Sequence, residues 1–77
     1  MKESVLVLST AHMPSTSPDF GDLRAIPFEY GFVVWVSKLS VPEWMLFIME
    51  HARREGCTLI MFDRDVRISY KFRTWDW

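Results

Sequence analysis

Two residues near the end of the first apolar segment have the chemistry of a nucleophile and a base. Ser9 and His12 lie three positions apart, and a hydroxyl beside an imidazole is the pair that many acyl-transfer enzymes use. In an extended segment, residues at odd spacing point to opposite faces, so these two side chains do not meet in productive geometry. We therefore expect His12 to be a hydrogen-bonded structural histidine, and we predict no catalytic residue and no enzymatic activity.

The possible metal ligands are few. One cysteine and two histidines fall short of the four ligands of a structural zinc site. Cys57 follows a glycine and opens an apolar segment, which is the pattern of a buried, inert thiol. Asp63 and Asp65 have a spacing that suits a hard cation, but Arg64 between them opposes one. We expect these aspartates to form a turn, and we predict no metal and no cofactor.

The end of the chain combines cations with aromatic rings, at Arg67, Lys71, Arg73, Trp75 and Trp77. Single-stranded nucleic acid binders use this pairing for phosphate contacts and base stacking. Nine basic and ten acidic residues give a formal net charge of −1, so no overall field attracts phosphate. A solvated sheet face with packed tryptophans is our expectation, and nucleic-acid binding is the alternative.

An aromatic residue flanked by acids is a stronger sign of a binding surface. On a helix, Leu46 and Phe47 would fall on the outer face between Glu43 and Glu50, where an exposed ring is suited to be a hot spot for a basic protein surface. Further acids lie in segments rich in turn formers. The predicted partner-binding residues are Glu43, Phe47, Glu50, Asp63, Asp65, Asp19 and Asp22.

The helix that positions these residues is predicted from about Val41 to Glu55. Ser40 and Glu43 have the spacing of a capping box, and Gly56 is the expected left-handed stop. At about 100° per residue, its inner face consists of Val41, Trp44, Met45, Ile48 and Ala52. A second, short helix is expected from Ser17 to about Arg24, after a serine cap.

Four segments have strand patterns. The apolar run Val5–Leu8 predicts a central strand buried on both faces. Phe28–Ser37 is either one long strand or, from Arg24, two short strands bent at Tyr30 and Gly31. Thr58–Phe62 and Val66–Arg73 predict a hairpin across the Asp63–Asp65 turn. In its second strand the core-facing residues would be Val66, Ile68, Tyr70 and Phe72.

These elements predict a small two-layer α+β domain. Its three- to five-stranded, mostly antiparallel sheet would carry one main helix, and a ferredoxin-like arrangement is one alternative. Seventy-seven residues, 49% of them hydrophobic, suit a single domain over residues 1–77. The first apolar run is too short for a signal peptide or a membrane span, so we expect a cytoplasmic protein with no membrane partner. A deep cleft for a small-molecule substrate is not expected in a chain of this size.

Five short segments together carry a family resemblance. They are Leu8–His12, Glu29–Phe32, Ala52–Cys57, Phe62–Asp65 and Trp75–Trp77. In order and spacing they resemble a family of small uncharacterised proteins of plasmids, phages and integrated elements, and within that setting the short anti-CRISPR proteins, with type I-C as the expected target. The resemblance implies a non-enzymatic inhibitor that binds a Cas protein or the CRISPR surveillance complex of a bacterial host and blocks target DNA. The formal net charge of −1 is smaller than expected for an inhibitor that simply mimics DNA.

Overall fold

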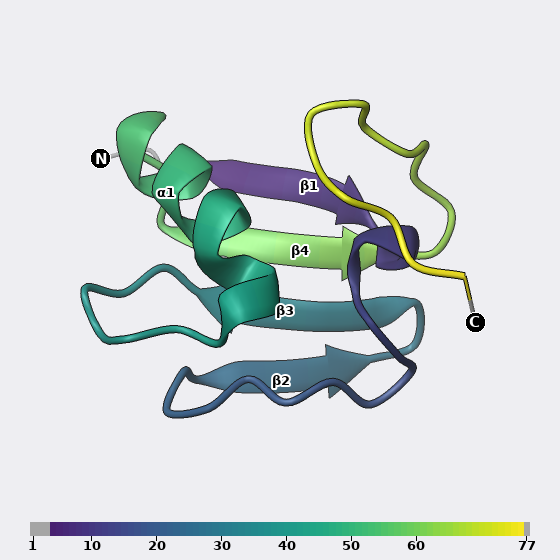
Figure 1. The fold of residues 1–77 in the computed structure, drawn as a ribbon, viewed down its shortest axis with the longest axis horizontal. Helices are drawn as coiled ribbons and strands as arrows, with labels where there is room; N and C mark the ends of the chain where they lie inside the picture. Colours follow the sequence, from purple (N-terminus) through teal and green to yellow (C-terminus); the bar gives the residue numbers. More distant parts are fainter. Residues whose placement is uncertain (1–3, 77) are drawn as a thin grey trace.

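A four-stranded mixed sheet carries one α-helix on one face (Figure 1). The computed structural model describes residues 4–76. Its strands are β1 (Val5–Ser9), β2 (Ala25–Phe28), β3 (Gly31–Trp35) and β4 (Leu59–Asp63), in the sheet order β1-β4-β3-β2. β1 pairs with β4 in parallel, and the other two pairings are antiparallel. The helical elements are η1 (Thr10–His12), η2 (Glu43–Met45) and α1 (Leu46–Arg54). The predicted α+β class, mostly antiparallel sheet and single main helix are confirmed.

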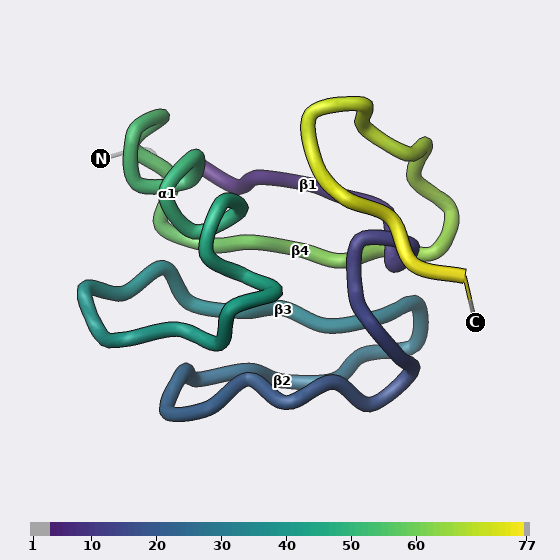
Figure 2. The backbone as a smooth tube through the Cα atoms, in the orientation of Figure 1, coloured from purple at the N-terminus to yellow at the C-terminus, as the bar shows by residue number. Residues whose placement is uncertain are grey.

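The ferredoxin-like alternative is met only in part. That arrangement places a helix in each of two crossovers. Within residues 4–76, the connection from β1 to β2 contains only the three-residue 3₁₀ turn η1. The tube in Figure 2 shows this connection passing along β2 as an irregular segment before the chain enters that strand.

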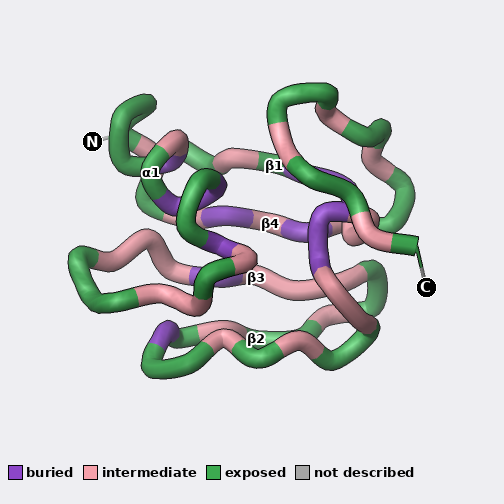
Figure 3. Tube along the Cα trace, in the orientation of Figure 1, coloured by how far each residue is buried: buried purple, intermediate pink, exposed green. Residues whose placement is uncertain are grey.

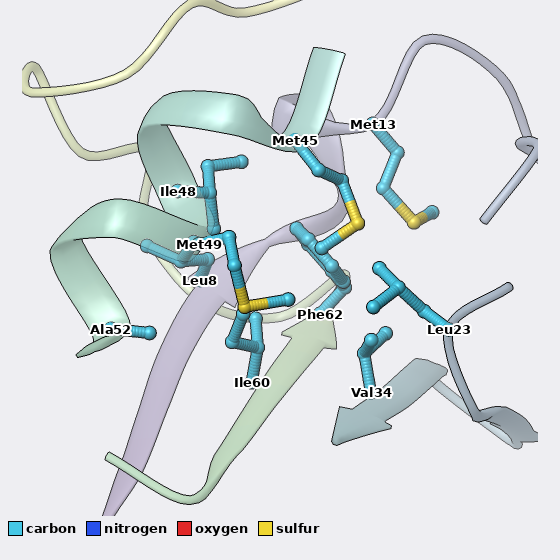
Figure 4. Packing of buried hydrophobic residues seen from close by; sticks show 10 residues of the cluster. All are labelled: Leu8, Met13, Leu23, Val34, Met45, Ile48, Met49, Ala52, Ile60 and Phe62. Carbon is cyan, nitrogen blue, oxygen red and sulfur yellow. The ribbon is translucent and has the colours of Figure 1, made fainter. Parts of the chain in front are cut away.

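The hydrophobic core lies between α1 and the face of the sheet that α1 covers (Figures 3 and 4). The helix contributes Ile48 and Ala52, as predicted from the periodicity, and also Met49, while the predicted Met45 is buried at the end of η2. Ile60 and Phe62 alternate on β4 and are fully buried, which fits a strand at the centre of the sheet. Within residues 4–76, the buried apolar residues are Leu8, Met13, Leu23, Val34, Met45, Ile48, Met49, Ala52, Ile60 and Phe62.

The main helix begins later than its capping box predicted. Pro42 has an extended backbone, with ψ of 148°, and the next three residues form the 3₁₀ turn η2 before α1 starts at Leu46. Neither Pro42 nor Met45 caps a helix through its side chain, so the Ser40–Glu43 capping box is wrong. The stop is confirmed, because Gly56 has a φ of +71°, a conformation that glycine adopts without steric cost.

The segment from Arg24 to Ser37 forms two strands rather than one. β2 and β3 are joined by a tight turn at Glu29 and Tyr30, so the interpretation with two short strands is right and the single long strand is wrong. Gly31, which follows the turn, lies so close to β4 that an added Cβ would be 1.8 Å from the carbonyl oxygen of Phe62. Only glycine lets the hairpin approach β4 this closely.

The first strand lies at an edge of the sheet, which corrects its predicted central place. Within the sheet β1 pairs only with β4, and its residues Val5 and Val7 are 39% and 45% exposed. The unbroken apolar run arises because the face of the sheet away from α1 is also apolar on the neighbouring strands, at Met61 on β4 and Val33 on β3. An apolar run in β1 therefore does not imply that both faces of this strand are buried.

The predicted second hairpin strand, Val66–Arg73, is wrong. β4 already pairs with β1 on one side and β3 on the other, so no free edge of β4 is available for a following strand. The chain instead leaves the sheet after the turn at Asp63 and continues without regular structure. Two of its predicted core residues, Ile68 and Tyr70, are 50% and 103% exposed.

The short helix predicted from Ser17 to Arg24 does not form either. Asp19 accepts a hydrogen bond from the N–H of Gly21 through its carboxylate, at 2.8 Å, and Gly21 has a φ of +60°. An aspartate that bonds its own backbone two residues on favours a turn over a helix. The region is therefore an irregular connection, with Leu23 buried in the core.

Candidate functional site

A groove of about 610 Å³ opens between the start of α1 and the C-terminal segment. We call it the aromatic groove, and its lining residues are Pro14, Glu43, Trp44, Leu46, Phe47, Arg73 and Trp75. Apolar side chains form most of this lining, with one acid and one base among them. Its size falls in the range of pockets that receive small ligands or partner side chains, roughly 300–1,000 Å³.

Trp44 lines the groove and is held by several contacts. Its indole N–H donates to the backbone carbonyl of Asp19 at 2.8 Å. Its ring packs against Phe20 and Phe62, with centroids 5.5 Å and 5.9 Å apart. A tryptophan fixed by a hydrogen bond and by two ring contacts loses little freedom when a partner binds, which favours recognition.

The opposite wall belongs to the C-terminal segment, which His12 anchors. His12 is 1% exposed, its Nε2 accepts from the N–H of Ser69 at 3.0 Å, and its Nδ1 lies 2.9 Å from the carbonyl of Arg73. An N–H group can only donate, so the proton of the imidazole lies on Nδ1, which donates to that carbonyl. The ring of Phe72 lies edge-on between His12 and His51.

Trp75 closes this wall. Its backbone N–H donates to the carbonyl of Ala11 at 2.9 Å, and its side chain is partly buried. The guanidinium of Arg73 lies over the ring, 3.7 Å from its centroid, a cation–π distance. The predicted packing of the terminal tryptophans therefore holds in part for Trp75, while Trp77 lies outside the described residues.

Leu46 and Phe47 project outward beside the groove, as the helical periodicity predicted. Phe47 is 74% exposed and Leu46 is 42% exposed, although phenylalanine is among the residues most often buried. Both follow the buried Met45, so the same turn that anchors the helix in the core presents these two side chains to solvent. An exposed ring beside a preformed apolar groove has the form of a binding hot spot.

The predicted acidic residues fall into separate groups. Glu43 lines the groove, and Asp19 is adjacent to it through the bond from its carbonyl to Trp44. Asp22 is exposed in the same connection, and Glu50 is exposed on α1, three residues after Phe47. Of the predicted acids, Glu43 is therefore the one that lines the groove.

Asp63 and Asp65 do not join that group. They occupy the turn after β4, where the carboxylate of Asp63 accepts from the N–H of Asp65 at 2.9 Å and the N–H of Arg64 donates to the carbonyl of Tyr30. The predicted turn-forming role is confirmed for this pair. Because neither residue lines the aromatic groove, we place both outside the candidate site.

The other reactive side chains have structural roles. Both ring nitrogens of His12 bond the backbone of the distant C-terminal segment, whereas the hydroxyl of Ser9 accepts from the N–H of Ala11 and fixes a local turn. Cys57 is partly buried at the end of the helix. Among the described residues, no three His, Cys, Asp or Glu side chains lie close enough together to hold a metal ion.

Sequence reasoning found one wall of the groove and missed the other. The sequence predicts Glu43 and Phe47 on a binding surface, but it predicts Arg73 on a separate basic strand and Trp75 as a packed residue after that strand. Arg67, Lys71 and Arg73 are all exposed, yet no regular strand aligns them. The bonds of His12 to Ser69 and Arg73, the bond from Trp75 to Ala11 and the contact of Phe72 with His51 hold the C-terminal segment near α1, and nothing in the sequence spacing signals these contacts.

The fold and the groove define a small two-layer α+β domain with a preformed, aromatic-lined surface. Residues 5–77 match the family described as "Family of unknown function (DUF5983) C-terminal domain", and the chain belongs to that family. No curated protein and no solved structure matches the chain significantly. Within the described residues, no helix has the length and apolar character needed to cross a membrane.

Proposed function

We propose that this domain is a non-enzymatic binding module that docks a partner protein in the aromatic groove. The observation that carries the proposal is Phe47, which is 74% exposed and lines the groove together with Trp44, a ring fixed by a hydrogen bond and two aromatic contacts. Burial of such a ring on binding stabilises a complex without reorganising the domain.

The partner we propose is a basic, DNA-binding surface of a type I CRISPR surveillance complex, so that the bound domain blocks target DNA. Two features support it. One is the resemblance of the five sequence segments to anti-CRISPR proteins. The other is the acid Glu43, which lines the groove together with Phe47, while Glu50, Asp19 and Asp22 are further exposed acids. The test is a pull-down of the purified complex at low salt, and failure to recover the domain would refute this choice of partner.

The groove itself is tested with Phe47→Ala. Truncating a hot-spot ring costs about 2 kcal/mol or more, equivalent to roughly 30-fold in Kd. The matched control is Tyr70→Ala, because Tyr70 is a fully exposed aromatic residue outside the groove and its loss should leave Kd unchanged. Both variants should melt like the wild type, since neither ring lies in the core. Equal affinity of the Phe47 variant and the wild type would contradict the proposal.

The acids are tested by charge reversal. Glu43→Lys should weaken binding by roughly threefold to tenfold, mainly through a slower association rate, because rim charges act on diffusional encounter. Glu29→Lys is the control, because Glu29 is exposed in the β2–β3 turn, away from the groove. This substitution changes the net charge by the same amount as Glu43→Lys. If both variants lower the association rate to the same degree, the effect comes from net charge and not from the groove.

The alternative is a nucleic-acid-binding accessory protein, which the exposure of Arg67, Lys71 and Arg73 favours. Titration with a single-stranded oligonucleotide at low salt would then quench the tryptophan fluorescence, and salt would reverse it. The stacking of Arg73 over Trp75 occupies a face of that ring, so base stacking there first requires the guanidinium to move. Unchanged fluorescence would exclude this function.

A further inference from the structure

We propose that two copies of this chain form a dimer by antiparallel pairing of β1 with β1 of the second copy, which joins their sheets into one. β1 contributes no residue to the aromatic groove, so this interface is separate from the docking site. The proposal rests on the free backbone groups of one edge strand, on the block at the other edge, and on the sequence of β1.

The backbone of β1 presents hydrogen-bonding groups to its open edge. The carbonyl of Ser4 accepts from the N–H groups of Thr58 and Leu59, so Ser4 faces β4. Backbone groups alternate in direction along a strand, and those of Val5 and Val7 therefore point away from β4. In the described part of the chain, no backbone bond beyond the β1–β4 ladder involves these two residues. An edge of this kind is a template for another strand.

The opposite edge of the sheet is blocked. The carbonyl of Arg24 accepts from the N–H of Trp35, so by the same alternation the backbone of Pro27 faces away from β3, at the outer edge of β2. Proline has no N–H to donate, and it is one of the residues that protect an edge strand. A sheet with one usable edge pairs once, which gives a closed two-fold dimer rather than a fibre.

The sequence of β1 suits a second copy of itself. It has no charged residue and no proline, which are the usual devices that protect an edge. The stretch from Val5 to Val7 reads the same in both directions, so a two-fold axis at Leu6 places Val5 opposite Val7 of the second copy. In that register the four valines exchange about four N–H···O=C bonds. Ser9 is 5% exposed, so pairing is confined to the first part of the strand.

The exposed valines become cross-strand neighbours in this arrangement. Val5 and Val7 are 39% and 45% exposed, and both lie on the face of the sheet away from α1. Opposed valines on one face of an antiparallel pair stabilise it. The interface covers only a few residues per copy, well below the area of a permanent dimer, so the association is reversible and depends on concentration.

The experiment is analytical ultracentrifugation of the full chain across a micromolar to millimolar range, with Val7→Pro and Ile26→Lys as variants. Wild type should rise from 9.2 kDa toward twice that mass. Val7→Pro replaces an outward N–H of β1 by a proline nitrogen, which cannot donate, and Pro27 has the same effect on β2. The Val7→Pro variant should therefore stay monomeric. Ile26 is 44% exposed on the same sheet face but on β2, so Ile26→Lys should still dimerise.

Hydrogen exchange of the wild type supplies a readout that does not depend on any variant. The N–H groups of Val5 and Val7 should exchange more slowly as concentration rises, whereas that of Leu6, which faces β4, should not change. A wild type that remains at 9.2 kDa overturns the proposal. So does loss of the dimer in Ile26→Lys with retention in Val7→Pro, which would indicate packing of the two sheet faces instead.

Discussion

Replacing His12 with leucine should strongly destabilise the domain. The side chain is 1% exposed, and it joins the N–H of Ser69 to the carbonyl of Arg73. Leucine fills similar space but leaves both backbone groups without a partner. An unpaired buried group costs about 1–3 kcal/mol, and since both bonds are only partly buried we expect about 2–4 kcal/mol in total.

That loss is large for a chain of this size. The free energy of unfolding of a 77-residue domain is on the order of 4–12 kcal/mol, so His12→Leu should lower Tm by roughly 10–25 °C. Thermal and urea unfolding followed by circular dichroism measure it. Asparagine can replace the Nδ1 donor and glutamine the Nε2 acceptor, so each of these variants should recover part of the loss. A leucine variant that melts within about 2 °C of wild type would refute the anchoring role.

Three other changes test the packing. Gly31→Ala should prevent folding, because the new Cβ would lie 1.8 Å from the carbonyl oxygen of Phe62. A Cβ at Gly56 meets open space, so Gly56→Ala should lower the free energy of unfolding by only about 1 kcal/mol, the cost of a positive φ for alanine. Urea unfolding measures both changes. Met49→Ala removes a fully buried side chain and should cost about 2–5 kcal/mol by the same measurement. Deleting residues 75–77 removes the Trp75 N–H that donates to the carbonyl of Ala11, and it also removes one wall of the groove. The deletion should therefore both lower Tm and abolish partner binding. An unchanged Tm would show that this segment does not support the fold.

Local patterns accounted for the helix and the tight turns. The apolar periodicity after Val41 identified the inner face of α1, and Gly56 identified its end, because both signals depend on residues within one or two turns of one another. The aspartate turn at Asp63 followed from the same local chemistry. The same patterns failed for the segment after Val66, where alternation predicted a strand that has no neighbour to pair with.

The candidate site was only half predictable for a related reason. Phe47 could be placed on an outer face from its position relative to Met45, and its exposure follows from helix geometry alone. Trp75 and Arg73 reach the groove through a contact between His12 and Ser69, which are 57 positions apart. Such a contact depends on how the irregular C-terminal segment folds back over the domain, and no periodicity in the sequence encodes that path.

The sequence by itself determined the class of the domain, the inner face of α1 and the outward position of Phe47, because these follow from hydrophobic periodicity and from turn residues acting over short distances. The tertiary structure alone decided which strands are neighbours. By placing β4 between β1 and β3, it moved the apolar β1 to an edge and left the C-terminal segment without a sheet partner. That segment then became a wall of the groove, because the buried imidazole of His12 satisfies backbone groups that no strand could pair.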